Sequence, residues 1–519
     1  MRKLYRMLFS RYFISAMVIL AELALIFYLV LVAYDYSLVA LAIITAVNVA
    51  IVVSLINRAA NPEYKVSWLV VVMLIPPFGA VLYAMFYSRR VSSKEARVMR
   101  EIQDNLDGFS DTGEGISQEC DTEFAMLRRE DSLAAGKAHA ILNDDRLARV
   151  YMRSSSEFFE LGEDMYERML SDIASAEKYI FLQYFIIEDG EMWKTIHALL
   201  LKKVGEGVEV RVMYDDIGCM KTLPSRYNRR LAAEGIRCIR FAPVTPRIST
   251  AHNNRNHRKI LIVDGRIAYT GGINIADEYI NKKNRFGHWK DGGVRIVGDA
   301  ATGLLKLFIT SWDLSVNKIT DFSEYMPGKD LENVGDGGYY IPFGSGPAPI
   351  YNRPVGKNAL LNIINQAQKY VYITTPYLIV DYDLTESLRN AALRGVDVRI
   401  ITPGRADKKM VKVMTKSSYP YLIEAGVGIY EYQPGFIHEK SIVSDDIYAI
   451  VGTINLDYRS LVHHYENAVW IYASPTVVDI RNGFMKTVSV SERKNMKEVR
   501  LTPFEWIVRN IMRIFAPLL

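Results

Sequence analysis

One chemical pattern occurs twice in this chain, and its spacing is the same both times. Residues 257–264 (HRKILIVD) and 438–445 (HEKSIVSD) share a histidine, a lysine two positions later and an aspartate five positions after the lysine. After six further residues, each is followed by a glycine turn that ends in asparagine, GGIN at 271–274 and GTIN at 452–455. An internal repeat of this kind predicts two similar structural units.

The sequence around the motifs repeats as well. Strand-length apolar runs at 178–187 and 208–213 flank a stretch of helix length before the first motif, and runs at 369–377 and 396–401 do so before the second. Alternation of strand-length and helix-length segments is typical of α/β folds. The chain therefore predicts an α/β protein with two tandem α/β/α units that form one shared active site.

The repeats set the expected domain boundaries. We assign the first repeat to residues 151–320 and the second to 351–500, joined by a connector at 321–350 that is rich in Gly, Pro and Asp. Residues 93–150 are expected to be a linker beside the membrane, and residues 501–519 an amphipathic helix. A chain of 519 residues is too long for one ordinary core, so several units are expected.

Residues 1–92 predict a membrane anchor with two or three apolar segments. The run at 13–33 is long enough to cross a bilayer core of about 30 Å, which takes about 20 helical residues. A second run covers 38–56, and a third, at 68–87, contains a Pro-Pro pair and would span with a kink or re-enter. A cleaved signal peptide is the competing interpretation, but its apolar region would be only about 7 to 15 residues long.

The orientation of this anchor stays open. Basic residues near membrane segments favour the cytoplasmic side, but the clusters at 2–11, 58–65 and 89–100 cannot all be cytoplasmic if three segments span. A re-entrant third segment would remove this conflict. The membrane face that carries the catalytic part is therefore not predicted.

The residue types in the motifs suit phosphoryl chemistry. On an extended segment, alternate side chains point to one face, so that each histidine lies beside the lysine two positions on. A neutral imidazole can attack phosphorus and an imidazolium can give up a proton near neutral pH. The lysines would place positive charge beside the phosphate oxygens. The predicted catalytic residues are His257, Lys259, Asp264, His438, Lys440 and Asp445.

Further polar residues complete the predicted site. Asn274 and Asn455 would add neutral donors to the phosphate oxygens, and Thr453 a hydroxyl in the second half-site. Two carboxylates, Glu466 in the second repeat and Asp291 in the first, are candidates to accept the other imidazole N–H and fix the tautomer of each histidine.

Neither a metal nor nucleic acid is expected. The three cysteines form no CxxC pair, and no histidine spacing matches a metal motif. A formal charge of +5 is small for this length, so it does not by itself argue for a nucleic-acid partner. The histidines outside the motifs are expected to be structural or exposed, and they include His139, His197, His288, His463 and His464.

The two motifs resemble the HKD motifs of the phospholipase D superfamily. The context is similar to bacterial, membrane-anchored cardiolipin synthases in four places: the run at 68–83, the phrase at 375–377, the phrase at 452–460 and the terminal FAPLL. Two features depart from that pattern. There is an extra apolar segment, and Gly272 stands where a Ser or Thr is usual, which removes a hydroxyl from the first half-site.

The resemblance implies a phosphatidyltransferase without a cofactor. In the family, one phosphatidylglycerol loses its glycerol to form a phosphatidyl-histidine, and a hydroxyl of a second phosphatidylglycerol displaces the enzyme to give cardiolipin. By resemblance His257 is the nucleophile and His438 the acid and base, although the similarity of the half-sites allows the reverse. The implied setting is a bacterial cell membrane with a multi-pass anchor and a phospholipid substrate, and self-association is left open.

Three alternatives compete with this interpretation. A nuclease of the same superfamily would share the motifs but would not need the apolar segments. A phospholipase D hydrolase, or a phosphatidyltransferase using another alcohol, differs only in the acceptor, which the motifs do not encode. A catalytically dead membrane scaffold would be expected to have lost a motif histidine or lysine, and none is lost.

Overall fold

A computed structural model of the chain describes isolated residues between 17 and 32 and residues 38–516, apart from 59–60, 76–77, 88–92, 113–115, 245–253, 328–333, 349, 352 and 500–501. The chain divides into two compact units. One unit contains Met1–Arg90, Ala242–Asn254 and Pro503–Leu519, and the other contains Val91–Phe241 and Arg255–Thr502. Both motifs belong to the second of these units.

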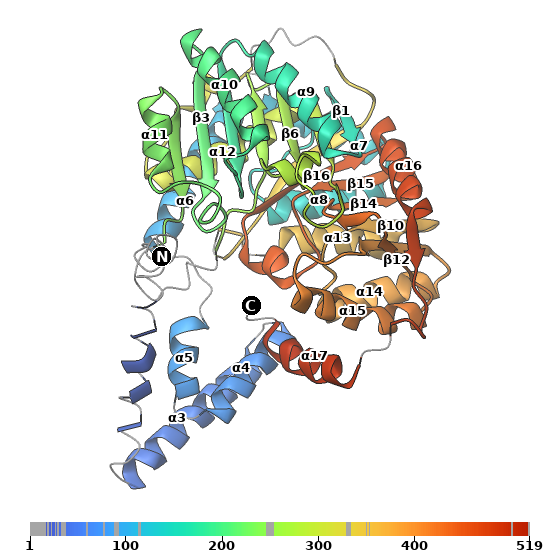
Figure 1. The fold of residues 1–519 in the computed structure, drawn as a ribbon. Coiled ribbons are helices and arrows are strands. Elements are labelled where there is room, and N and C mark those ends of the chain that lie inside the picture. Colours follow the sequence, from blue (N-terminus) through green and yellow to red (C-terminus); the bar gives the residue numbers. More distant parts are fainter. Residues whose placement is uncertain are drawn as a thin grey trace. The chain divides into compact units, whose positions relative to one another are not determined.

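The first repeat contains a seven-stranded sheet in the order β1-β8-β6-β5-β2-β3-β4 (Figure 1). β2, β3 and β4 run parallel, and the remaining neighbours are antiparallel. The strands are β1 (Ser154–Phe159), β2 (Tyr179–Tyr184), β3 (Glu209–Asp215), β4 (Arg237–Phe241), β5 (Ile260–Val263), β6 (Ile267–Gly271) and β8 (Gly293–Gly298). The helices are α9 (Gly162–Ser175), α10 (Glu191–Gly205), α11 (Tyr227–Ala233) and α12 (Ala300–Val316).

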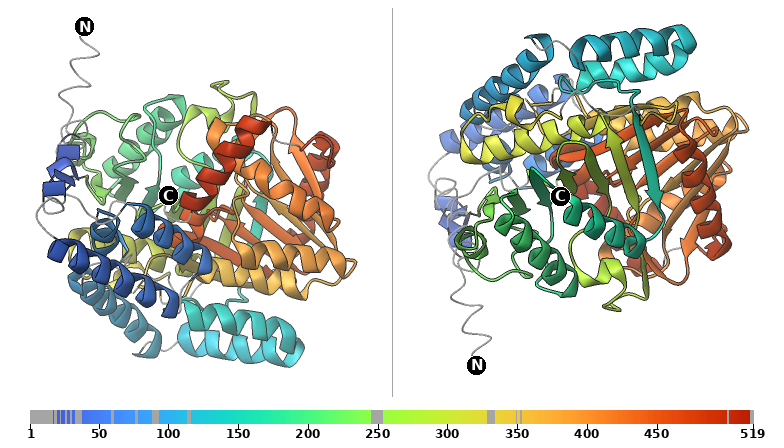
Figure 2. Two further views of the ribbon diagram at one scale, coloured as in Figure 1. Left: turned by 90° about the horizontal axis from the view of Figure 1, so that it is seen from below. Right: turned by 90° about the horizontal axis from the view of Figure 1, so that it is seen from above.

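The second repeat has the same strand order, β9-β16-β15-β14-β10-β11-β12, with β17 added beside β12. Its strands are β9 (Tyr339–Ser345), β10 (Tyr370–Thr374), β11 (Asp397–Pro403), β12 (Gly428–Tyr432), β14 (Ser441–Ser444), β15 (Tyr448–Gly452), β16 (Glu466–Tyr472) and β17 (Ser491–Arg493). Its helices are α13 (Val355–Gln366), α14 (Tyr382–Leu393), α15 (Lys409–Glu424) and α16 (Pro475–Ser489). The prediction of an α/β protein built from two similar sheets is confirmed, and Figure 2 shows the two repeats side by side, green and orange.

Helix α12 explains how the two sheets share one core. Its residues from Ala300 to Asp313 are all buried, because the helix contacts β5 and β8 of the first sheet and β9 of the second. A helix that is covered on several sides needs apolar residues around most of its circumference, and the sequence AATGLLKLFITSWD provides them. Each leucine or phenylalanine buried here stabilises the fold by about 2 kcal/mol.

The expected linker at 93–150 is instead mostly helical. It forms α6 (Ser93–Thr112), α7 (Ile116–Glu130) and α8 (Ser132–Asp144). α6 packs on α12 and α8 packs on α13. The buried residues Met99, Ile102 and Leu106 recur at helical spacing, so an apolar face orders α6. The expected connector at 321–350 also contributes structure, because β9 lies within it.

Among its described residues, the other unit contains the helices α3 (Leu38–Asn57), α4 (Pro62–Leu74), α5 (Phe78–Phe86) and α17 (Pro503–Phe515). Across the described residues, no helix combines the length and apolar character that crossing a bilayer requires. The apolar segment expected at 13–33 falls largely outside the described residues. The membrane spans expected in residues 1–92 are therefore not confirmed.

The third apolar segment is two helices that pack on each other. A Cβ at Gly79 would collide with the carbonyl oxygen of Val71, so glycine is needed where α5 crosses α4. The rings of Trp68 and Tyr83 stack edge to face with centroids 5.6 Å apart. Phe515 of α17 packs against the same cluster, so the C-terminal helix belongs to this unit.

Candidate active site

Two short ladders join the repeats, and each runs into one of the motif histidines. In the first, Asn256 pairs with Tyr465 in a parallel bridge, and the His257 N–H donates to the Tyr465 carbonyl over 2.9 Å. In the second, β13 (Gly435–Ile437) pairs in parallel with β7 (His288–Lys290), and the His438 N–H donates to the Lys290 carbonyl over 2.7 Å. Each histidine is therefore held beside a strand of the other repeat.

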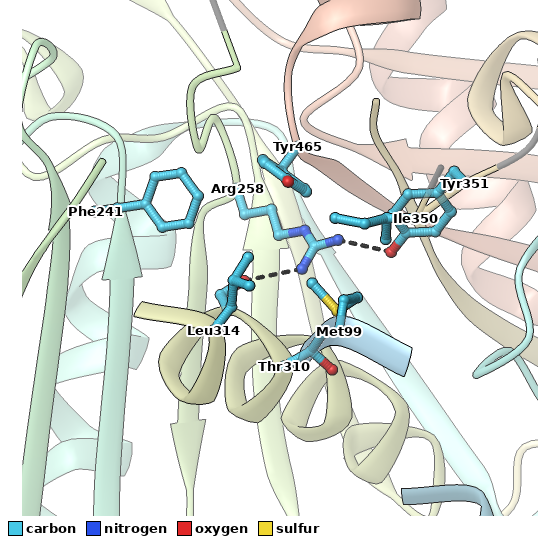
Figure 3. Close-up of a pocket in the computed structure, with 9 residues that line it drawn as sticks. Met99, Phe241, Arg258, Thr310, Leu314, Ile350, Tyr351 and Tyr465 are labelled. Atoms are coloured by element: carbon cyan, nitrogen blue, oxygen red, sulfur yellow. Dashed lines mark hydrogen bonds between the residues drawn. The ribbon is translucent and has the colours of Figure 1, made fainter. Parts of the chain in front are cut away.

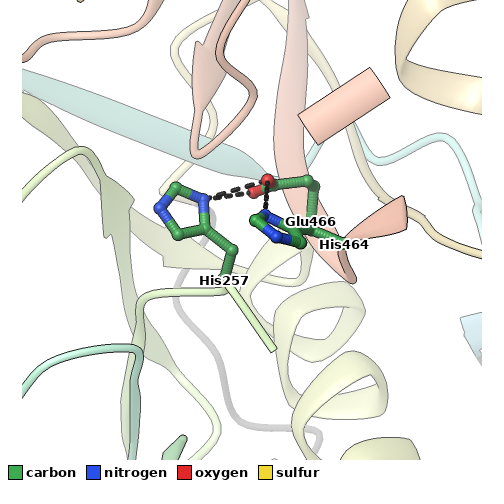
Figure 4. Close-up of side chains that lie close together, drawn as sticks. All are labelled: His257, His464 and Glu466. Carbon is green, nitrogen blue, oxygen red and sulfur yellow. Dashed lines mark hydrogen bonds and ion pairs between the residues drawn. The ribbon is translucent and has the colours of Figure 1, made fainter. Parts of the chain in front are cut away.

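The residue that follows each ladder is a buried carboxylate. Tyr465 is followed by Glu466, whose two carboxylate oxygens both lie 2.9 Å from His257 Nδ1 (Figure 4). Lys290 is followed by Asp291, whose Oδ2 lies 2.6 Å from His438 Nδ1. The contacts are crossed, because the first repeat's histidine meets the second repeat's carboxylate and the reverse. Each Nδ1 is engaged, which leaves Nε2 of each imidazole for chemistry.

The two motif lysines are buried beside the histidines. Lys259 Nζ donates to the carbonyl oxygen of His257 over 2.7 Å, and Lys440 makes the equivalent contact with His438. Burial lowers the pKa of Lys259 to about 7 and that of Lys440 to about 8. An anion that enters the site would restore their full charge, because an opposite charge favours the protonated amine.

Both histidines are neutral in the free site. Burial lowers the pKa of His257 to about 3, although Glu466 opposes the shift. Burial and then the charges of Lys440 and Lys259 lower the pKa of His438 well below its ordinary value. Without substrate, the two lysine charges are balanced by the two carboxylates.

The two carboxylates differ in how they are held. Thr453 and Ser460 each donate a hydroxyl to Glu466 over 2.5 Å. Burial alone would raise the pKa of Glu466, but the contact with His257 brings it below its usual range. Asp291 receives a backbone N–H from Gly292 over 2.9 Å, and burial raises its pKa to about 6.

Gly272 is the reason for this difference. It occupies the position that Thr453 has in the second repeat, and a Cβ there would collide with Asp291 Oδ1. A threonine therefore cannot stand beside the shorter carboxylate in its present place. The first half-site lacks a hydroxyl because its carboxylate fills that space.

The two asparagines also differ. Asn274 is hydrogen-bonded at both polar atoms, since its Oδ1 accepts from the Ile186 N–H over 3.0 Å and its Nδ2 donates to the Tyr279 hydroxyl over 2.7 Å. Asn455 Oδ1 is buried and has no hydrogen-bond partner among the described residues. The Asn455 amide is thus the less committed of the two for a ligand.

The motif aspartates lie at the far ends of their strands. Asp264 accepts the backbone N–H groups of residues 177–179, each over 2.8 Å, and Asp445 accepts those of residues 368–370. Each carboxylate thereby anchors the turn that leads into β2 or β10. We infer that the two aspartates position the strands, and their assignment as catalytic residues stays a prediction.

The residue between histidine and lysine points to the opposite face in each motif. Arg258 is buried and donates to the Glu466 carbonyl over 3.0 Å and to the Tyr351 hydroxyl over 2.9 Å, beside a small cavity (Figure 3). Glu439 accepts from Lys290 Nζ over 2.9 Å. Both contacts join one repeat to the other. The residues on the face opposite the catalytic side chains therefore hold the two repeats together, and the crossed histidine–carboxylate contacts require this association.

Sequence reasoning missed several residues that contact the catalytic groups, and three of them are described here. The Tyr279 and Trp289 rings lie 5.5 and 5.7 Å from the His438 ring between centroids. The ring of His464 lies 5.6 Å from that of His257, although it was expected to be structural or exposed. The signal for His464 was its place two residues before Glu466, because extended segments put such residues on one face.

Two α/β repeats that contribute crossed histidine–carboxylate pairs and two buried lysines to one site define a phospholipase D-like enzyme. The comparisons agree. Residues 169–285 and 360–488 match the family described as "Cardiolipin synthase, PLD-like domain", and residues 46–86 match "Phospholipase_D-nuclease N-terminal". The chain belongs to the cardiolipin synthase family of phosphatidyltransferases.

Similar proteins cover most of the chain. A cardiolipin synthase of Halalkalibacterium halodurans is 31% identical over 478 residues, which is 92% of each chain. An uncharacterized protein of Streptococcus mutans is 38% identical over 90% of this chain and 99% of its own. The crystal structure of phosphatidylserine synthase from Haemophilus influenzae matches with a TM-score of 0.54 at 15% identity, over 74% of this chain and 98% of that one, and so shows the fold alone.

Proposed function

We propose that this enzyme transfers a phosphatidyl group from one phosphatidylglycerol to a hydroxyl of a second, giving cardiolipin and glycerol through a phosphatidyl-histidine. The observation that carries the proposal is the pair of crossed histidine–carboxylate contacts in a chain of the cardiolipin synthase family. A double displacement needs a nucleophile and a proton carrier, and two oriented imidazoles supply both.

The difference between the carboxylates supports His257 as the nucleophile. Attack on phosphorus puts positive charge on the imidazole, and the ionised Glu466 lies at 2.9 Å to stabilise that charge. His438 is paired with Asp291, whose pKa is raised to about 6 by burial. A carboxylate with a raised pKa beside His438 suits a histidine that takes up and then releases a proton.

The charges in the site indicate that the proton needed by the leaving glycerol is carried by His438. A bound phosphodiester adds one negative charge between two neutral histidines, and this raises the pKa of His438 so that it takes up a proton. His257 Nε2 then bonds to phosphorus as the phosphorus–oxygen bond to glycerol breaks, and the His438 proton passes to the glycerol oxygen. In the second step His438 takes the proton of the acceptor hydroxyl, whose oxygen bonds to phosphorus as the phosphorus–nitrogen bond breaks.

The substrate of this reaction is a membrane lipid. We propose that the apolar segments of residues 1–92 hold the enzyme at the bacterial cell membrane, where both substrate molecules lie. The match of residues 46–86 to the N-terminal family supports this proposal.

The decisive experiment supplies phosphatidylglycerol as the only lipid. Purified enzyme should form cardiolipin and free glycerol in equal amounts, without CDP-diacylglycerol, as measured by mass spectrometry and an enzymatic glycerol assay. His257→Ala should abolish both products, whereas the control His139→Ala, at an exposed position, should not change them. Phosphatidic acid as the main product would make the enzyme a hydrolase, and a requirement for another added alcohol would replace the acceptor.

A further inference from the structure

We propose that His464 joins His257 and Glu466 in a binding site for a divalent transition-metal ion such as Zn²⁺, and that metal bound there inhibits the enzyme. The inhibition rests on the proposed function, because the ion would engage the histidine that we assign as nucleophile. The binding does not rest on it, since it follows from the geometry of three side chains.

The first observation is the spacing of the three ligand atoms. Among the described residues, His257, His464 and Glu466 form the group of potential ligands whose atoms all lie within 4.8 Å of one another. His257 Nδ1 lies 2.9 Å from the Glu466 carboxylate, and His464 Nδ1 lies 3.7 Å from Glu466 Oε1 (Figure 4). The two imidazoles flank one carboxylate.

The second observation is that the imidazole of His464 lacks a hydrogen bond. Both of its ring nitrogens are shielded from solvent, and neither is hydrogen-bonded to any described residue. Its nearest carboxylate oxygen, at 3.7 Å, is too distant for a hydrogen bond. Shielded polar atoms are nearly always hydrogen-bonded, so an imidazole with two shielded nitrogens and no hydrogen bond, beside a carboxylate, suggests a ligand that completes it.

The ligand set selects the class of ion. Two imidazoles and one carboxylate are ligands that Zn²⁺ accepts, with a fourth position left to water or substrate. Tetrahedral bonds of about 2.1 Å separate ligand atoms by roughly 3.4 Å, so the three side chains need to shift by about an ångström. Hard cations such as Mg²⁺ prefer all-oxygen sites, so they should not bind here.

Binding would block the site in two ways. A metal ion bound at Nδ1 of His257 would need the lone pair of that nitrogen, so the proton that Nδ1 now shares with Glu466 would move to Nε2 of the neutral imidazole. The Nε2 lone pair would then no longer be free to attack phosphorus. The Glu466 carboxylate would then bind the metal ion, so its negative charge would no longer stabilise a positively charged His257 imidazole.

The test measures binding and inhibition separately on the full-length enzyme in detergent. Metal-free enzyme is titrated with Zn²⁺ against a chelating dye, and Co²⁺ is added in parallel because its visible absorption reports tetrahedral coordination. The variants are His464→Asn and His464→Gln, with His139→Asn as a control that removes an exposed histidine. Melting temperatures confirm that each variant is folded.

Wild type and His139→Asn should bind one ion and show the tetrahedral Co²⁺ spectrum, whereas both His464 variants should bind more than about tenfold more weakly. The concentration of Zn²⁺ that halves activity, taken relative to each protein's own metal-free rate, should rise by the same factor. Equal binding by wild type and the His464 variants would overturn the site. Zn²⁺ binding that needs His464 but leaves activity unchanged would overturn the proposed inhibition. Zn²⁺ binding by a protein that is inactive on phosphatidylglycerol would support the metal site and contradict the proposed function.

Discussion

Glu466→Gln should separate the electrostatic part of catalysis from the fold. The substitution keeps the shape of a fully buried side chain, and an amide can still bond to the hydroxyls of Thr453 and Ser460. What it removes is one negative charge at 2.9 Å from His257 Nδ1. The pKa of His257 is lowered to about 3, so this charge acts only when the imidazole becomes positive during attack on phosphorus.

The size of the effect follows from Coulomb's law. Two unit charges 2.9 Å apart interact by about 6 kcal/mol at an effective dielectric constant of about 20. Since each 1.36 kcal/mol changes a rate about tenfold, kcat should fall by about 10⁴. KM should change little, because the free imidazole and the bound ground state are both neutral.

The assay is the initial rate of cardiolipin formation in phosphatidylglycerol vesicles, with the melting temperature measured beside it. Glu123→Gln is the matched control, because Glu123 is also a buried glutamate but lies on α7, among the helices that precede the first repeat. It should keep the wild-type kcat. A loss of less than about tenfold in Glu466→Gln would refute the charge argument, since one tenfold step is only 1.36 kcal/mol. A large fall in melting temperature would make the residue structural.

Four further outcomes are expected. Burial raises the pKa of Asp291 to about 6, so the carboxylate that pairs with His438 becomes protonated as the pH falls through that value. We therefore expect kcat/KM to rise with pH up to about 6, and Asp291→Asn should remove this limb from the pH profile. The same raised pKa means that folding disfavours the ionised form, so Asp291→Asn should increase the free energy of unfolding by up to about 3 kcal/mol above pH 6, and denaturant titration should show the gain disappear below about pH 4. In His438→Ala, a labelled phosphatidyl substrate with a good leaving group should still load the enzyme with an acid-labile adduct, whereas His257→Ala should stay unlabelled; label on His438 in the latter would invert the two roles. EDTA should not lower the rate of cardiolipin formation, and a loss that a divalent ion restores would contradict the proposed chemistry.

The repeat explains why most of the fold could be predicted. The runs at 178–187 and 369–377 contain β2 and β10, and the runs at 208–213 and 396–401 overlap β3 and β11, because buried parallel strands are continuously apolar. The helices within residues 93–150 were missed, since their amphipathic spacing lies in a polar stretch that was taken for a linker.

The site could be predicted in its residue types but not in its pairing. The sequence indicated Glu466 and Asp291 as partners for the histidines, but nothing along the chain says which carboxylate meets which histidine. That choice depends on the ladders between repeats, such as the pairing of β7 with β13, and such contacts have no local sequence signal. The role of Gly272 was also hidden, because the space that it leaves is filled by Asp291 from a later segment of the same repeat.

Because of the crossed pairing, the two half-sites depend on each other throughout the reaction, including the interval between its two steps. If either repeat undocked after the first step, both histidines would lose their carboxylates together, because each carboxylate is carried by the other repeat. The lipid bound to His257 would then have no oriented base to activate water or any other acceptor. An enzyme whose repeats have separated would therefore keep the phosphatidyl group bound to His257 and would not release phosphatidic acid into the membrane.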